Sequence, residues 1–212
     1  MRPIYRRLLG SRGSRPISPN DVLESVDMSG RPVRPILRAE FDAMAAADTY
    51  YKGRWRYTSV ALAEAAKLIV RDDIRTALEV GAPVKPTLTG ADVMDYRLRE
   101  ELDPGVEITV HDATMVPWPF ADKQFGLLIA LQVFEHLGTR QPEAFGEVRR
   151  VARHAIISLP IDWDMGDPFN VHHMIPLERV LAWFAPTVPT RILEGNPGPK
   201  KRLVFVFENL AP

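Results

Sequence analysis

The sequence contains no cysteine among its 212 residues. This absence excludes disulfide bonds, thiolate metal sites and a cysteine nucleophile. It fits the reducing cytosol, where disulfides are rare, and we predict a cytoplasmic protein. The chain also lacks an apolar run of the ~18–20 residues that cross a bilayer. Its longest apolar runs, such as 127–131, have the length of a strand. We therefore expect no membrane span.

An excess of charge of either sign is missing as well. Lys and Arg together number 27, as do Asp and Glu, so the formal net charge is zero. No global field attracts nucleic acid or an anionic membrane, and we expect a small-molecule partner and no nucleic acid. Residues 1–20 contain five arginines and no acid. They are interpreted as a disordered basic tail, with a transit peptide or an arm for an anionic partner as alternatives.

Apolar strand patterns alternate with helical patterns from residue 58 to residue 212. The sequence predicts a helix from Thr58 or Ser59 to about residue 70, with residues 53–57 breaking the pattern before it, and helices over 141–152 and 177–184. It predicts strands over 76–80, 91–95, 108–110, 125–131, 155–159, 191–193 and 203–207. This alternation indicates an α/β domain with a mostly parallel sheet covered on both faces. The last two strands, joined by a Gly/Pro-rich turn, predict an antiparallel end. Residues 1–57 are interpreted as an N-terminal extension.

Polar residues follow the predicted strands at the edge where a parallel sheet binds ligands. Gly81 follows the first strand, where it either lets a ligand approach the backbone or forms a plain turn. Asp95 ends the second strand; it can accept hydrogen bonds from a ribose diol or cap a helix. Asp112 follows the third strand and can accept from a purine amine, although Asp is also common in turns.

Four sequence elements within 111–138 carry a family resemblance. They are Asp112-Ala113, Val116-Pro117-Trp118, Phe125-Gly126 and Phe134-Glu135-His136. In this order and spacing they resemble the class I S-adenosylmethionine-dependent methyltransferases, in particular the methyltransferase type 11-like group. The resemblance covers residues 58–212. It implies a Rossmann-like three-layer sandwich, with a mostly parallel sheet of seven strands and an antiparallel closing strand.

The resemblance implies S-adenosyl-L-methionine as the cofactor and methyl transfer to a small-molecule acceptor as the activity. It implies these cofactor-binding residues: Glu79, Gly81, Asp95, Asp112, Ala113 and Gln132. Among them, Glu79 would hold the amino-acid end of the cofactor, Asp95 the ribose hydroxyls and Asp112 the adenine amine. The glycine and the alanine would face the cofactor with their backbone, and the glutamine would line the methionine side.

The loop after Gly81 departs from the pattern of the family. Glycines usually stand two and four residues beyond this position, where the present sequence has Pro83 and Lys85. With Pro83 and Pro86 in the loop, we expect no full crossover helix between 82 and 90. The alternative function is therefore a non-catalytic binding or regulatory protein with the same fold. A dinucleotide dehydrogenase fits worse, because the sequence contains no G-x-G-x-x-G.

Three histidines are candidates for the chemistry. Methyl transfer depends mainly on placing the acceptor in line with the leaving sulfur, which can supply up to ~7–11 kcal/mol. A hydroxyl acceptor also benefits from a base. His136 follows the fourth strand, and His172 and His173 follow the fifth, so we expect transfer to oxygen. Asp162 and Asp164 with the last two histidines could instead bind a divalent cation, but a solvated acidic loop is the plainer interpretation and we predict no metal. A homo-oligomer is left open.

Overall fold

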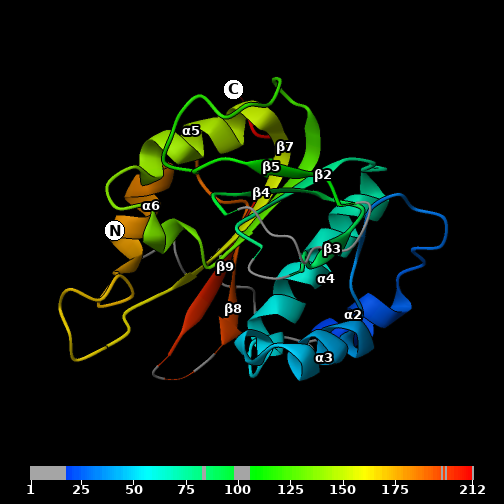
Figure 1. Cartoon of the computed structure of the whole chain (residues 1–212), viewed down its shortest axis with the longest axis horizontal. Coiled ribbons are helices and arrows are strands. Elements are labelled where there is room, and N and C mark those ends of the chain that lie inside the picture. The colour runs from blue at the N-terminus through cyan, green and yellow to red at the C-terminus, as the bar shows by residue number, and fades with distance from the viewer. Residues whose placement is uncertain (1–17, 83–84, 98–105, 197, 199, 212) are drawn as a thin grey trace.

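The computed structural model describes residues 18–82, 85–97, 106–196, 198 and 200–211, and in it seven strands form one sheet (Figure 1). In spatial order they are β5 (Ile108–Val110), β4 (Asp92–Asp95), β2 (Ala77–Val80), β6 (Phe125–Leu131), β7 (Ala152–Pro160), β9 (Arg202–Phe207) and β8 (Arg191–Asn196). The first five run parallel, and β9 is antiparallel to both of its neighbours. The predicted fold class, α/β with a mostly parallel sheet and an antiparallel closing strand, is confirmed.

Helices cover the two faces of the sheet (Figure 1). The long helix α4 (Trp55–Arg71) packs on one face, and α5 (Gln141–Val151) and α6 (Leu177–Phe184) pack on the other. Strand β6 shows why both faces are apolar. Its Leu127 side chain belongs to the cluster under α4, whereas that of the next residue, Leu128, belongs to the cluster under α5. Side chains alternate between faces along a strand, so a strand buried on both sides reads as a continuous apolar run.

Helix α4 begins earlier than the sequence predicts. Its first residue is Trp55, three positions before the expected cap at Thr58, so residues 55–57 do not break the helical pattern. The Trp55 side chain is buried, and its ring lies 5.0 Å from that of Phe41. Burial of this aromatic surface extends the helix beyond what local capping signals indicate.

The described part of the first 57 residues packs against the domain. It contains α2 (Pro19–Ser25), β1 (Arg34–Pro35), α3 (Arg38–Ala47) and the 3₁₀ helix η1 (Thr49–Tyr51). The side chains of Leu23 and Val33 are buried in the cluster that α4 forms with the sheet. A Cβ atom on Gly90 would lie 1.9 Å from the Pro32 carbonyl oxygen, so the two backbones touch. The division of the chain at residue 57 stays a prediction, and the basic tail at 1–17 lies outside the described residues.

The connection between β2 and β4 contains a short strand, β3 (Leu88–Thr89), which pairs with β1 and which the sequence did not predict. Residue 82 and residues 85–91 form no helix, in agreement with the expectation for this loop, although Pro83 itself lies outside the described residues. The backbone of Lys85 is held by the hydroxyl of Tyr51, which accepts from its N–H at 2.8 Å. Among the helices that the structure describes, none has the length and apolar character needed to cross a membrane.

Candidate active site

A cavity of about 740 Å³ opens at the carboxyl ends of β2, β4, β5 and β6. We call it the strand-end cavity. It is lined by six of the residues that the sequence singled out: Gly81, Asp95, Asp112, Ala113, Gln132 and His136. Its volume lies within the ~300–1,000 Å³ that is typical of small-molecule sites. The remaining predicted site residues, Glu79, His172 and His173, do not line it.

Gly81 is the point where the backbone itself forms the cavity wall. Its φ angle is +74°, and a Cβ atom there would lie 2.7 Å from the Cγ2 atom of Val133. Its N–H donates to the Met94 carbonyl at 2.8 Å, which joins the end of β2 to β4. Glycine is therefore required both for the backbone angle and for the close approach of the loop after β6.

Asp95 is a buried carboxylate at the end of β4, and Arg97, one of the residues that it contacts, is more exposed. The Asp95 side chain is 1% exposed, and the Arg97 side chain paired with it is 47% exposed. The backbone N–H of Arg97 donates to Oδ1 at 3.0 Å, and its guanidinium donates to both oxygens at 3.2 and 3.3 Å. Ribose hydroxyls can compete for these oxygens with a half-exposed cation. Arg97 was not identified from the sequence. The pattern that indicates it is a cation two residues after an acid at the end of a strand.

Asp112 and Ala113 form a tight turn after β5. Oδ1 of Asp112 accepts from the backbone N–H and from the hydroxyl of Thr114, both at 2.8 Å, and these bonds lower the pKa of the carboxyl. Oδ2 accepts no hydrogen bond from the described part of the chain. The Ala113 carbonyl accepts from the buried Trp118 indole at 3.1 Å, which fixes the loop. The turn thus presents an ionised carboxylate at the edge of the cavity.

Gln132 forms the floor of the cavity at the end of β6, with a φ angle of +61°. Its amide nitrogen donates to the Ser158 hydroxyl at 3.2 Å, and its amide oxygen accepts from Nε of Arg202 at 2.8 Å. A left-handed backbone at a non-glycine residue costs energy and is held by the surrounding contacts. Gln132 therefore connects β6 to β7 and β9 beneath the cavity.

Glu79 is buried in β2 and accepts hydrogen bonds from the loop that follows the strand. Its Oε2 accepts from the backbone N–H groups of Thr87 at 2.6 Å and Leu88 at 3.1 Å, and the Thr87 hydroxyl donates to the carboxyl as well. Burial raises the pKa of Glu79 to about 7 in spite of these bonds. The space beside it measures only about 20 Å³, too small for an amino-acid moiety. In this conformation Glu79 holds the loop around β3, a contact that no local sequence signal indicates.

His136 lies on the 3₁₀ helix η2 (Phe134–His136) and faces the strand-end cavity. Burial lowers the pKa of its imidazole. The ring of His172 lies behind it, with ring centroids 5.0 Å apart. His173 points elsewhere: its Nδ1 accepts from the Met165 backbone N–H at 3.2 Å and lies 3.9 Å from Asp164.

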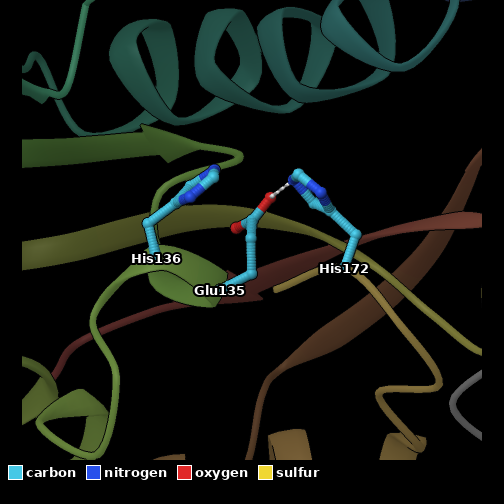
Figure 2. A group of neighbouring side chains, drawn as sticks. All are labelled: Glu135, His136 and His172. Atoms are coloured by element: carbon cyan, nitrogen blue, oxygen red, sulfur yellow. Dashed lines mark ion pairs between the residues drawn. The ribbon is translucent and has the colours of Figure 1, made fainter. Parts of the chain in front are cut away.

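The structure groups His136 and His172 with Glu135. From the sequence, Glu135 was named only as part of the motif at residues 134–136. Figure 2 shows the Glu135 carboxyl group beside the two imidazole rings, whose centroids lie 5.0 Å apart. Potential ligand atoms of the three residues lie within 4.8 Å of one another. The alternative cation site predicted at Asp162, Asp164, His172 and His173 is not among the groups of three or more donors that the described residues bring together.

Two arginines and three aromatic residues lie close to this group. The Arg202 guanidinium lies 4.4 Å from the ring centroid of Trp163 and 4.6 Å from that of Tyr57. The Arg54 guanidinium lies 3.8 Å from the Tyr50 ring, and Tyr50 lines the strand-end cavity. These side chains come from segments that lie far apart in the sequence, so no local pattern brings them together.

Comparison with known proteins finds a family model that matches part of the chain. The methyltransferase domain family matches residues 76–155, the segment that contains β2 to β6 and the site residues at their ends. The resemblance to the class I S-adenosylmethionine-dependent methyltransferases is thereby confirmed, and with it S-adenosyl-L-methionine as the cofactor. No curated protein matches the sequence.

Solved structures share the fold at low identity. A protein from Pyrococcus horikoshii is 14% identical, with a TM-score of 0.53, over 82% of this chain and 100% of that chain. The N-methyltransferase NodS from Bradyrhizobium japonicum, in complex with S-adenosyl-L-homocysteine, is 13% identical, with a TM-score of 0.50, over 91% of this chain and 99% of that chain. At these identities the likeness establishes the fold alone.

Proposed function

We propose that this protein transfers a methyl group from S-adenosyl-L-methionine to an oxygen atom of a small-molecule acceptor, in the cytoplasm. One observation carries the proposal: Asp95 at the end of β4 and Asp112 after the neighbouring strand β5 line the strand-end cavity, and His136 lines the same cavity. This arrangement offers acceptors for a ribose diol and for an exocyclic amine, together with a base.

The bound cofactor supplies a methyl group on a sulfonium; its transfer to a hydroxyl breaks the carbon–sulfur bond, leaves the electron pair on sulfur and releases the hydroxyl proton. We assign that proton to His136. Burial keeps the pKa of His136 below its ordinary value, so the imidazole is neutral and able to accept a proton at pH 7. His172, whose pKa is lowered first by burial and then by His136, stands behind it. The role predicted for His173 stays a prediction.

The cofactor-binding residues take separate tasks in the proposal. Asp95 accepts from the ribose hydroxyls after Arg97 gives way, and Asp112 accepts from the adenine amine through Oδ2. The backbone at Gly81 and Ala113 allows close approach, because neither residue extends a long side chain into the cavity. Gln132 bounds the methionine side. Glu79 reaches the amino-acid end only if the loop at 87–88 moves, so its role in binding depends on that rearrangement.

Calorimetry with S-adenosyl-L-homocysteine tests the cofactor site. Asp95→Ala should weaken binding at least tenfold, because a buried acceptor for two hydroxyls is lost, worth ~1.5–3 kcal/mol. The matched control is Asp122→Ala, which removes an exposed carboxylate at the far end of β6 and should leave the affinity unchanged. Equal affinity of the Asp95 variant and the wild type would show that Asp95 does not hold the ribose.

A second candidate function is a non-catalytic binding protein with the same fold. The observation that favours it is the position of Glu79. The Glu79 carboxyl group accepts hydrogen bonds from the backbone of Thr87 and Leu88 and does not line the strand-end cavity. Release of S-adenosyl-L-homocysteine during incubation with a panel of hydroxylated small molecules separates the two functions. Turnover that falls in His136→Gln while cofactor affinity is retained supports the enzyme. Micromolar cofactor binding with no turnover on any acceptor supports the binding protein.

A further inference from the structure

Glu135, His136 and His172 form a cluster of donors that the proposed methyl transfer does not fully use. Nε2 of His172 lies 3.8 Å from Oε1 of Glu135, and the carboxyl group lies beside both imidazoles (Figure 2). Glu135 and His136 come from η2, and His172 comes from the segment between β7 and α6. Two segments that are far apart in sequence therefore converge at one point beside the strand-end cavity.

The Glu135 carboxyl group is buried without a hydrogen-bond partner. Its side chain is 0% exposed, and neither oxygen is hydrogen-bonded within the described part of the chain. Buried carboxyl groups are normally paired or bound to a metal, because burial without a partner is unfavourable. A partner for this carboxyl group would lie close to ligand atoms of both imidazoles, because the donor atoms of the three residues are within 4.8 Å of one another.

The tautomer of His172 is fixed by Asn170. The Asn170 side-chain oxygen accepts from the backbone N–H of His172 at 3.0 Å, which identifies that atom as the oxygen. The same oxygen lies 3.1 Å from Nδ1 of His172, so Nδ1 carries the ring proton and donates. Nε2 is then left with a free lone pair on the side of Glu135. Metal-binding histidines are oriented in this way by a hydrogen bond from the other ring nitrogen.

We propose that Glu135, His136 and His172 bind a divalent transition-metal ion of the Zn²⁺ type. Two imidazoles and one carboxylate are the donors that Zn²⁺ and its neighbours prefer, and three protein ligands leave one position open. Mg²⁺ and Ca²⁺ need mostly oxygen ligands, whereas this cluster offers one carboxylate and two imidazole nitrogens. We therefore expect binding of Zn²⁺ and Co²⁺ and none of Mg²⁺.

The geometry requires only a modest contraction. Ligand atoms about 2.1 Å from a tetrahedral ion lie about 3.4 Å apart. The donor atoms of the cluster lie within 4.8 Å of one another, and His136 is exposed enough to rotate toward the other two. The role of the ion rests on the proposed function: held beside the strand-end cavity, which His136 lines, it would bind and acidify an acceptor hydroxyl. In the metal-loaded protein His136 is then a ligand rather than the base.

The test is calorimetric titration of the metal-free full chain with Zn²⁺ at pH 7.5, with Co²⁺ absorption as a second readout of coordination. The background is low, because the chain has five histidines and no cysteine. We expect one equivalent to bind, with affinity at least tenfold lower in Glu135→Gln, His136→Gln and His172→Gln. The matched control is His173→Gln, which removes the neighbouring imidazole outside the cluster and should bind as the wild type does.

Two outcomes overturn the proposal: no Zn²⁺ binding by the folded wild type, or equal affinity in the three cluster variants and the wild type. Circular dichroism establishes that each variant is folded, and if one unfolds, the Co²⁺ spectrum of the other two decides. Titration of the same samples with S-adenosyl-L-homocysteine keeps the two proposals apart. Intact cofactor binding without metal binding refutes the metal site alone, and metal binding without cofactor binding refutes the proposed function alone.

Discussion

Replacing Glu79 with glutamine should change how the stability of the fold depends on pH. The Glu79 side chain is fully buried, and burial raises the pKa of its carboxyl from 4.5 to about 7. A group whose pKa is higher in the folded state than in the unfolded state binds more protons when folded. Its contribution to stability is therefore complete below pH 4.5 and is lost as the pH rises through 7.

The size of the effect follows from the shift. One pKa unit corresponds to about 1.4 kcal/mol, so the shift from 4.5 to about 7 amounts to about 3 kcal/mol between the two ends of this window. Glutamine retains an oxygen that can accept from the Thr87 and Leu88 amides but does not titrate. The difference in the free energy of unfolding between Glu79→Gln and the wild type should therefore depend on pH. It should favour the variant by about 3 kcal/mol more at pH 8 than at pH 4.5.

Urea denaturation at pH 4.5, 6 and 8, with chelator present, measures this difference. The control is Glu40→Gln. Bonds from Arg34 lower the pKa of Glu40, so its contribution is present above pH 4.5, and its removal should affect stability equally at pH 6 and pH 8. If the Glu79 variant and the wild type differ by the same amount at all three pH values, Glu79 does not take up a proton on folding. The reasoning about its buried carboxyl would then be wrong.

Two further substitutions test the frame of the site. Gly81→Ala should destabilise the fold by about 1–3 kcal/mol, because φ is +74° and the new Cβ atom would lie 2.7 Å from Val133. Thermal melts measure the loss. The double variant with Val133→Ala should recover only the part of the loss that is due to this contact. Lys123→Met should lower the free energy of unfolding by about 2 kcal/mol, because Nζ donates to the carbonyl oxygens of Arg149, Ala152 and Leu210. If the urea midpoint of the variant equals that of the wild type, water replaces Lys123 as the donor to these carbonyl oxygens at no cost in stability.

The strand-end residues were found from the sequence because their positions depend on local periodicity. A parallel sheet brings the carboxyl ends of its strands to one edge, so a polar residue directly after an apolar run is placed by the run itself. Gly81, Asp95 and Asp112 follow β2, β4 and β5 in this way, and all three line the strand-end cavity. His136 was found by the same reasoning, one short turn after β6.

Contacts between distant segments were not predictable in this way. The pairing of β1 with β3 joins residues 34–35 to residues 88–89, and neither segment has the length of an ordinary predicted strand. Arg202 reaches Gln132 across 70 positions of sequence. Such contacts depend on the order of strands in the sheet, in which β9 lies next to β7, and no local pattern specifies which side chains then meet.

The sequence by itself determined the α/β class, the order of its strands along the chain and the carboxylates at the strand ends, because each follows from hydrophobic periodicity and from residues adjacent to it. Only the tertiary structure decided the environments of two other carboxyls. It directed the Glu79 carboxyl group toward the loop that follows β2, and it buried Glu135 beside His136 and His172. Burial and partners set the charge state of a carboxyl, and both arise from segments that the chain brings together only on folding.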